Sequence, residues 1–273
     1  MMAKSKRKEE LNEEFKDIKY ILTSSMRSKL LLAMHQDSKN LEQLRNELKK
    51  PSATILHGLK ELESINLIRK VQKNYQLTSN GYLLTTNMLK LIDNWYSIDK
   101  NKSFWNNHDL SGIPEEMLKK AYLLKDCEYV HSTTSDLSNA FNNYIKLLSN
   151  ASNIKMILPI YSENHFKHII NLLKDKKIKK LELIINLDIL NSIQKNKTIY
   201  RTLKNNKKVT IRTIDQPLKL FLTSSENFMS LTLFFRDGHY DDSQILIGNM
   251  KESINWAEEL YSTYYKKVLG DNK

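Results

Sequence analysis

The chain has 273 residues, of which 40% are hydrophobic and 27% are charged. This composition provides enough apolar residues for a sizeable core and argues against a largely disordered chain. A single cysteine, Cys127, excludes an internal disulfide and a cysteine-rich zinc site. The longest apolar runs, such as Met156–Ile160, are far shorter than the roughly 20 residues that a membrane-spanning helix needs.

Residues 1–14 are charged throughout and lack the apolar stretch of a signal peptide, so we expect a cytoplasmic protein that has no membrane partner. The formal net charge of +12 suits an anionic partner such as nucleic acid. A Lys- and Asn-rich composition can also reflect an AT-rich genome, so total charge alone discriminates poorly. The basic excess is denser in residues 1–90, which carry 17 basic and 10 acidic side chains.

The first third of the chain predicts four short helices, because its apolar residues recur three or four positions apart. The expected helices are Phe15–Leu22, Met26–Met34, Leu41–Leu48 and Ala53–Ser64. Ser24 or Ser25 is the expected N-cap of the second helix, and Ser52 that of the fourth. Two alternating segments, Leu67–Val71 and Tyr75–Leu77, flank a polar turn and predict a β-hairpin.

The solvent face of the fourth helix is small and polar near its start, which suits entry into the major groove of DNA. The residues expected to lie against the duplex are Ser52, Ala53, Thr54, His57, Gly58 and Lys60. The basic hairpin residues Arg69, Lys70 and Lys73 are expected to meet phosphates. A three-helix module that docks to a protein instead of DNA is the alternative interpretation.

Three segments of this region resemble the ArsR-like winged-helix family. They are Met26–Leu31 for its "R-x-x-I-L" helix, Ser52–Leu62 for its recognition helix, and Tyr75–Gly81 for its "Y-x-L-T-x-x-G" wing exit. The resemblance implies a winged helix-turn-helix that binds double-stranded DNA. No Cys pair or His-Asp cluster accompanies these segments, so we expect no metal sensing and assign no metal site.

A further helix, Tyr82–Ile98, carries an apolar stripe. We expect it to pair with a second copy in a homodimer that reads two half-sites, and packing within its own chain is the alternative. The polar stretch Asp99–Asn107 predicts a linker, and a helix is expected at Glu115–Leu124. His108 and Asp109, beside the Gly-Ile-Pro turn, are expected to fix this linker rather than to act as a base and its orienting partner.

The rest of the chain alternates between the two periodicities, which indicates an α/β layer. The expected helices are Thr134–Leu148, Glu163–Leu173, Leu187–Gln194 and Lys251–Lys267. The expected strands are Ile154–Pro159, Leu181–Asn186, Val209–Ile214, Leu218–Thr223, Met229–Phe235 and Gln244–Ile247.

Three phrases here resemble the archaeal methanogenesis regulator family. They are Trp105–Pro114, Phe234–Asp241 and the Trp256 to Tyr264 tail. The resemblance runs in order along nearly the whole chain. It implies an archaeal, methanogen transcription regulator whose C-terminal domain senses a ligand or assembles oligomers.

Two candidate sites can be weighed in the C-terminal part. His165 and Lys167 match the "H-x-K" of phospholipase D-type phosphodiesterases, but Leu172 stands where that chemistry needs Asp, so no catalytic residue and no cofactor are assigned. His165 and His168 could share a metal, yet no further ligands accompany them. A ligand site is the second candidate, and its residues are His131, Arg236, Asp237, Tyr240 and Asp241.

The sequence therefore predicts an α+β protein, in which an N-terminal winged helix-turn-helix precedes an α/β effector-type domain with a small mixed sheet. The expected parts are a charged leader at 1–14, the winged helix-turn-helix with its connecting helix at 15–98, a linker and helix at 99–125, and a sensor or oligomerisation domain at 126–273. The predicted function is that of a dimeric, sequence-specific transcriptional regulator with a small-molecule effector. A protein-interaction module and a phosphodiesterase-like enzyme are the alternatives.

Overall fold

The computed structural model describes residues 15–16 and 18–270, and the chain divides into two compact units, residues 1–92 and 93–273. Each unit has a hydrophobic core of its own. The leader expected at 1–14 lies outside the described residues. The described residues between 15 and 22 are helical, as the apolar spacing predicts.

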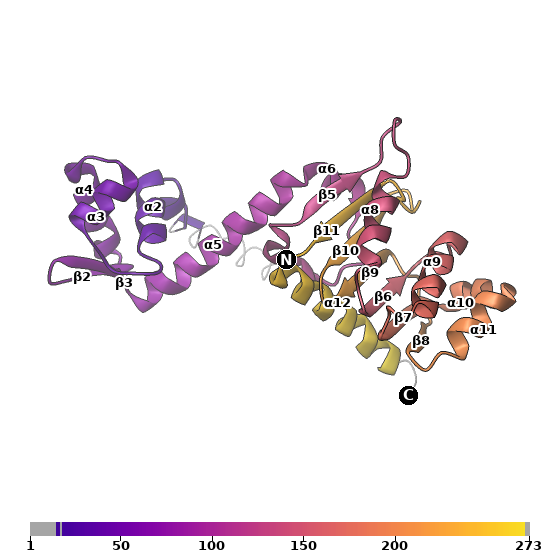
Figure 1. The fold of residues 1–273 in the computed structure, drawn as a ribbon. Helices are drawn as coiled ribbons and strands as arrows, with labels where there is room; N and C mark the ends of the chain where they lie inside the picture. The colour runs from indigo at the N-terminus through magenta and orange to yellow at the C-terminus, as the bar shows by residue number, and fades with distance from the viewer. Residues whose placement is uncertain (1–14, 17, 271–273) are drawn as a thin grey trace, which may run out of the picture. The chain divides into compact units, whose positions relative to one another are not determined.

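The first unit is a winged helix-turn-helix, as expected (Figure 1). Its helices are α2 (Ser25–Ala33), α3 (Leu41–Leu48), α4 (Ser52–Ser64) and the first part of α5 (Ser79–Lys100). Its strands are β1 (Lys39–Asn40), β2 (Ile68–Val71) and β3 (Asn74–Leu77). The strands form an antiparallel sheet in the order β1-β3-β2, in which β2 and β3 make the wing.

Local sequence explains where these helices begin. Ser24 caps α2, and its side chain accepts a hydrogen bond from the backbone N–H of Arg27 at 3.3 Å. Asn40 and Gln43 form a reciprocal capping box at the start of α3, with both hydrogen bonds 2.9 Å long. Both helices therefore have their first free N–H groups partly satisfied by side chains.

The second unit contains most of the strands. They are β4 (His108–Asp109), β5 (Glu128–His131), β6 (Asn153–Leu158), β7 (Lys180–Asn186), β8 (Val209–Ile214), β9 (Leu220–Ser225), β10 (Met229–Phe235) and β11 (Gln244–Gly248). Its helices are α6 (Lys102–Asn107), α7 (Glu115–Leu118), the 3-10 helix η1 (Ala121–Leu124), α8 (Asn139–Leu148), α9 (Glu163–Lys174), α10 (Leu187–Lys195), α11 (Lys197–Lys204) and α12 (Lys251–Gly270).

The eight strands form one mixed sheet in the order β5-β11-β10-β9-β6-β7-β8, with β4 paired to the end of β10. Strands β6, β7 and β8 are parallel, and the other pairs are antiparallel. The direction of the sheet therefore changes at β6. The sheet is mixed, as expected, but it is larger than the small sheet that the sequence suggested.

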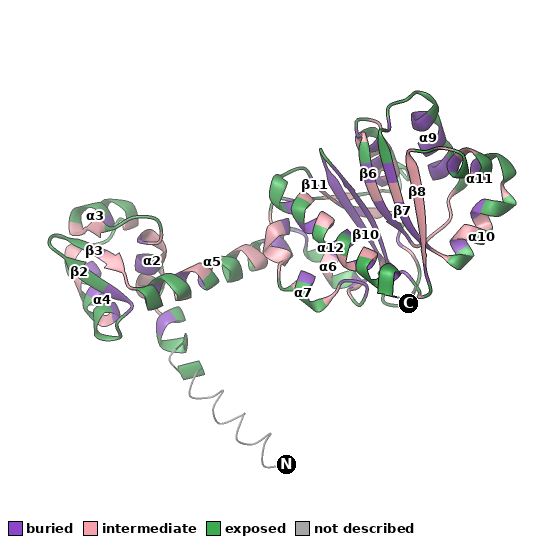
Figure 2. Cartoon of the chain, turned by 90° about the horizontal axis from the view of Figure 1, so that it is seen from below, coloured by how far each residue is buried: buried purple, intermediate pink, exposed green. Residues whose placement is uncertain are grey.

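Alternate residues of the central strands face two different helix layers. Met156 packs in one core while the next residue, Ile157, packs in the other, and Phe221 and Leu222 alternate in the same way. Residues of α8, α9, α10 and α11 join the first core, and residues of α7 and α12 join the second. The sheet is consequently buried between two layers of helices (Figure 2).

Several elements differ from the expectation. The stretch 99–107, expected as a polar linker, lies in the end of α5 and in α6. The helix expected at Glu115–Leu124 is divided into α7 and η1, and the carbonyl of Met117 at this division accepts a hydrogen bond from the indole N–H of Trp256 at 3.0 Å. The helix expected from Thr134 begins only at Asn139. Across the described residues, no helix is both long and apolar enough to cross a membrane.

Candidate nucleic-acid interface

The N-terminal half of α4 presents an exposed, small and polar surface. Ala53, Thr54, His57 and Lys60 are exposed, and Ser52 is half-buried. The side chain of His57 is 77% exposed. The opposite side of the helix packs into the core through Ile55, Leu59 and Leu62. Five of the six residues expected against DNA therefore lie on the accessible side of the helix.

Gly58 is the exception, and its expected contact with DNA is wrong. The residue is buried, and a Cβ atom at this position would lie 2.8 Å from Cδ1 of Leu30 and 3.0 Å from Cγ of Met26. The glycine therefore serves the close packing of α4 against α2. It does not serve an approach of the backbone to a duplex.

The start of α4 carries no side-chain cap. Ser52, expected as the N-cap, is the first helical residue, and Pro51 occupies the cap position without a side-chain hydrogen bond. The carbonyl of Pro51 accepts from the N–H of Ile55 at 3.2 Å. The first N–H groups of a helix have no partner within that helix, and together with the helix dipole they favour an anion.

An acidic group next to this surface, Glu61, is held by basic partners. Glu61 forms an ion pair with Arg27 at 2.9 Å and accepts a hydrogen bond from the hydroxyl of Tyr20 at 3.2 Å. His57 lies 3.6 Å from the same carboxylate. The hydrogen bond from Arg27 is the main reason that the pKa of Glu61 is lowered. Arg27 thereby offsets a negative charge that would face a phosphate backbone.

The wing exposes the three basic residues expected to meet phosphates, Arg69, Lys70 and Lys73. With its amide oxygen turned toward Arg69, Gln76 accepts hydrogen bonds from Nε at 2.7 Å and from Nη2 at 2.8 Å. The Lys70 ammonium group lies 5.5 Å from the centre of the Tyr75 ring. Neighbouring side chains therefore orient two of the three cations.

Two further lysines beside this surface were not included in the site assignment from sequence. Lys49 and Lys50 lie in the turn between α3 and α4, and both are exposed. Lys49 adopts a left-handed backbone conformation with φ of 50°, which ends α3. Their position immediately before Pro51 was the signal that could have identified them.

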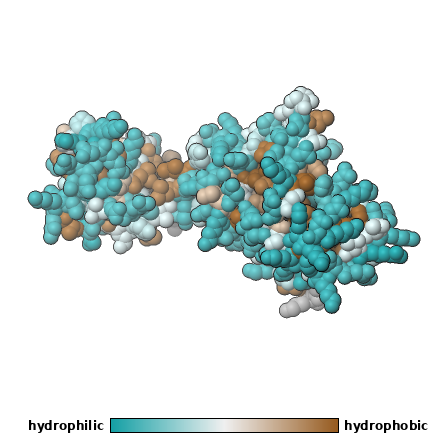
Figure 3. All heavy atoms as spheres, viewed as in Figure 1, coloured by the Kyte–Doolittle hydropathy of each residue, from teal (hydrophilic) through white to brown (hydrophobic). Residues whose placement is uncertain are grey.

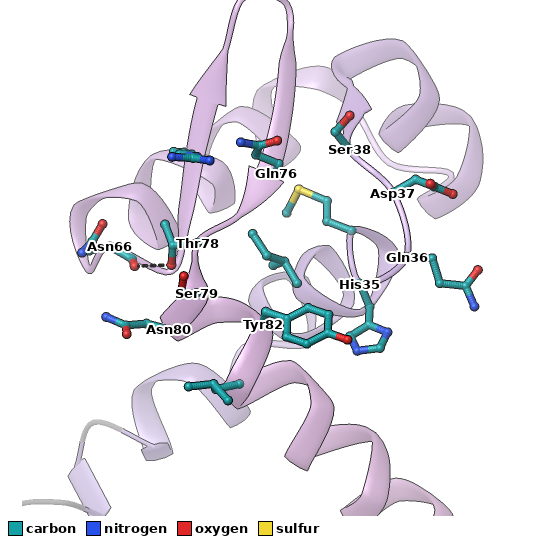
Figure 4. Close-up of a pocket in the computed structure, with 14 residues that line it drawn as sticks. His35, Gln36, Asp37, Ser38, Asn66, Gln76, Thr78, Ser79, Asn80 and Tyr82 are labelled. Atoms are coloured by element: carbon teal, nitrogen blue, oxygen red, sulfur yellow. Dashed lines mark hydrogen bonds between the residues drawn. The ribbon is translucent and has the colours of Figure 1, made fainter.

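A polar hollow of about 960 Å³ lies between the end of α2, the wing and the start of α5 (Figure 4). Arg69 and Gln76 line it from the wing, and His35 stacks on the ring of Tyr82 with centroids 5.1 Å apart. His35 also bonds through Nε2 to the hydroxyl of Thr86 at 3.1 Å. These contacts join the end of α2 firmly to α5.

The described residues contain no group of three or more His, Cys, Asp or Glu arranged to hold a metal ion.

The residues expected to form a ligand site in the second unit differ in exposure. His131, Arg236 and Asp237 are exposed, whereas Asp241 is buried and bonds to Nε2 of His108 at 3.0 Å. Tyr240 lines a cavity of about 350 Å³. The grouping of these five residues in one site stays a prediction. His108 does fix the segment in place, since Nδ1 also bonds to the carbonyl of Phe104 at 2.6 Å.

The "H-x-K" pair does not converge either. His165 is buried and lies 3.0 Å from the hydroxyl of Tyr144, while exposed Lys167 pairs with Glu163 at 2.8 Å. Residues two apart on a helix point to different faces, so the histidine and the lysine cannot act on one phosphate. Burial lowers the pKa of His165 to about 3, which keeps its ring neutral.

Family models match both units. The N-terminal domain of methanogenesis regulatory protein FilR1 matches residues 15–95, and the middle domain of the same protein matches residues 137–267. Methanogenesis regulatory protein FilR1 of Methanothrix harundinacea (strain 6Ac) is 26% identical over 257 residues. That alignment covers 92% of this chain but only 57% of the relative's own length.

Solved structures resemble the chain more distantly. The archaeal chromatin protein TrmBL2, whose structure is described as showing a novel mode of DNA binding, is 15% identical with a TM-score of 0.41, covering 88% of this chain and 90% of that one. Nuc, a phospholipase D family member from Salmonella typhimurium, is 10% identical with a TM-score of 0.38, covering 52% of this chain and 95% of that one.

Proposed function

Because the chain belongs to the family of methanogenesis regulatory protein FilR1, we propose that it is a sequence-specific DNA-binding transcriptional regulator that acts in the cytoplasm. One observation carries the proposal. The uncapped, exposed start of α4 lies in the same small unit as a wing with three exposed cations. A recognition helix in the major groove and a wing against the phosphates are how this fold meets a duplex.

The two parts of the surface have different tasks. The hydroxyl of Thr54 and the imidazole of His57 are exposed hydrogen-bonding groups that can discriminate base edges. Arg69, Lys70 and Lys73 supply charge that contacts any sequence equally. We also assign phosphate contacts to Lys49 and Lys50, since they stand beside the free N–H groups of α4.

Fluorescence anisotropy with a duplex from upstream of the protein's own gene tests the proposal. We expect Lys73→Ala to weaken binding evenly for specific and unrelated duplexes and to reduce the slope of log K against log[salt] by about 0.9, because one phosphate contact is lost. Thr54→Ala is expected to weaken binding to the specific duplex by about tenfold, with little change for unrelated DNA.

Lys174→Ala is the matched control, because it removes an exposed lysine from α9 in the second unit. It should leave both affinity and salt slope unchanged. An affinity for DNA that stays undetectable in dilute buffer contradicts the proposal and supports the protein-docking alternative. If Lys73→Ala weakens binding to only one of the duplexes, the assignment of the wing lysines to sequence-independent phosphate contacts is contradicted.

We propose that the regulator is a homodimer joined through α5. This helix exposes large apolar side chains at Leu91, Trp95 and Ile98, spaced four and three apart along one stripe. Hydrophobic side chains gather along the stretch of α5 in the space-filling view (Figure 3). A second copy that covers this stripe would also place two recognition helices on two half-sites.

We further infer that the second unit serves regulation and not catalysis. The matched family is described as regulatory, and the His165–Lys167 pair lacks the convergence that phosphoryl transfer needs. A small-molecule effector that binds this unit would account for an α/β layer joined to a DNA-binding module. Turnover of a generic phosphodiester that disappears in His165→Ala would contradict the inference.

A further inference from the structure

A cavity of about 350 Å³ opens at the carboxyl end of β6, where the sheet changes from parallel to antiparallel pairing. Its walls come from α8, the β6–α9 loop, the start of α9 and the strands β9, β10 and β11. The cavity therefore lies where the parallel and the antiparallel parts of the sheet meet.

Aromatic and aliphatic side chains make up about half of the cavity walls. Phe141 and Tyr144 line the cavity from α8, Ile160 lines it from the loop after β6, and Phe221 lines it from β9. The rings of Tyr144 and Phe221 meet edge to face with centroids 5.5 Å apart. A ligand here would bury an apolar body against a surface that packing already holds in place.

Several polar side chains also line the cavity, and a buried histidine is among them. His165 lines the cavity and is 4% exposed. Its Nε2 lies 3.0 Å from the hydroxyl of Tyr144, which in turn lies 3.2 Å from the hydroxyl of Thr223. No described residue forms a hydrogen bond with Nδ1 of His165. That nitrogen therefore keeps its hydrogen-bonding capacity for a molecule in the cavity.

The charges around the cavity exclude an acidic ligand. None of the described residues that line it is Lys or Arg, and the single charged residue is Asp242, which is exposed. Burial keeps His165 neutral by lowering its pKa to about 3 and raises the pKa of Tyr144, so neither supplies a charge. An anion would lose its hydration without gaining a cationic partner.

We propose that this cavity binds an uncharged small molecule with an apolar body and a hydroxyl group, which bonds to Nδ1 of His165. A hydroxyl both donates and accepts, so it satisfies that nitrogen whichever tautomer the contact with Tyr144 selects. The inference rests on the effector role proposed for the second unit, and it specifies the chemical class of the effector.

Saturation-transfer NMR on the full chain, without DNA, tests the proposal with two probes of nearly equal size and shape. 2-Phenylethanol is neutral and carries a hydroxyl, whereas phenylacetate is an anion at pH 7. We expect 2-phenylethanol to bind at millimolar concentration and phenylacetate to bind at least about tenfold more weakly, because only the anion carries a charge that must be buried without a partner. Equal binding of the two probes, or binding of neither, would overturn the proposal.

Three variants locate the site. Ile160→Trp adds bulk at the half-buried wall without touching the contact between His165 and Tyr144, and it should abolish binding of 2-phenylethanol. His165→Leu should weaken binding about fivefold through the lost hydrogen bond. His168→Leu removes an exposed histidine from the same helix and should change nothing. Unchanged binding in Ile160→Trp would place the probe elsewhere and overturn the proposal. DNA binding has its own titration, so a failure of either proposal can be told from a failure of the other.

Discussion

At the exit of the wing, the backbone of Leu67 approaches Gly81 so closely that a side chain would not fit at this position. A Cβ atom at this position would lie 1.9 Å from the carbonyl oxygen of Leu67, and that oxygen also accepts a hydrogen bond from the N–H of Thr78. The carbonyl of Leu67 cannot move aside without losing its hydrogen bond from Thr78, the residue between β3 and α5. Steric hindrance by the carbonyl of Leu67 thus explains the glycine at the end of the "Y-x-L-T-x-x-G" segment.

We therefore expect Gly81→Ala to destabilise the first unit by about 3 kcal/mol, the upper range for overpacking a fixed site. Thermal unfolding followed by circular dichroism measures the effect. Gly270→Ala is the control, since a Cβ atom there meets nothing within 4 Å. Equal melting temperatures for Gly81→Ala and the wild-type protein would show that the carbonyl of Leu67 does move.

Asp109 should contribute stability that depends on pH. The backbone N–H and the hydroxyl of Ser111, together with Lys219, bind its carboxylate and lower its pKa to about 2 from an ordinary value of 3.8. A carboxyl group with a lowered pKa in the folded state stabilises the protein above its ordinary pKa, and this contribution is lost as the pH falls through about 2.

Asp109→Asn tests this expectation. The variant should be less stable than the wild-type protein at pH 6, and the difference should shrink between about pH 4 and pH 2. Urea unfolding across this range measures it. A difference that stays constant with pH would show that the carboxylate contributes through shape and not through charge.

Single residues differ in how far the sequence can place them. The exposed positions Thr54 and His57 follow from helical periodicity, because the apolar stripe of α4 fixes its opposite face. Gly58 could not be placed in this way, since its contact is with Leu30 of another helix. The absence of a cap at Pro51 likewise depends on where the helix begins, and helix ends are poorly determined by propensity.

Among the described elements, α5 carries the apolar stripe that we propose as the dimer interface. Trp95 is 64% exposed, and Leu91 and Ile98 lie on the same stripe. We expect Leu91→Ser combined with Trp95→Ser to shift the protein from dimer to monomer in sedimentation velocity, because the stripe loses most of its apolar area. Tyr96→Ser, which removes an exposed aromatic side chain from another face of the same helix, should leave the dimer intact. A wild-type monomer would contradict this interface.

Elements with a strong local pattern were predicted well. Strands β6, β7, β8 and β10 lie within one residue of their expected bounds, because runs of branched and aromatic residues favour strands wherever they pack. Strand β5 and helix α11 were missed. The four residues Glu128–His131 contain only two large apolar side chains, and they become a strand by pairing with β11, more than a hundred positions away.

At the scale of the whole molecule, the order of the parts was predictable and their assembly was not. The change from helical periodicity to alternating strands and helices marks a winged helix followed by an α/β layer. The cavity beside His165 could not be predicted, because it joins residues from Leu137 to Ile245 that only the strand order brings together. Four of the five expected ligand residues lie between Arg236 and Asp241, yet Arg236 and Asp237 are exposed and Asp241 is buried.

The bare start of α4 also has a consequence for how quickly a complex forms. At the start of α3, the capping box must break before the first N–H groups can bond to another acceptor. At the start of α4, Pro51 provides no side-chain hydrogen bond that would have to break. The oxygen anion of a phosphate would meet backbone N–H donors that have no side-chain hydrogen bond to break. The association step then costs little reorganisation within the protein, so selectivity rests on how soon a mismatched duplex leaves.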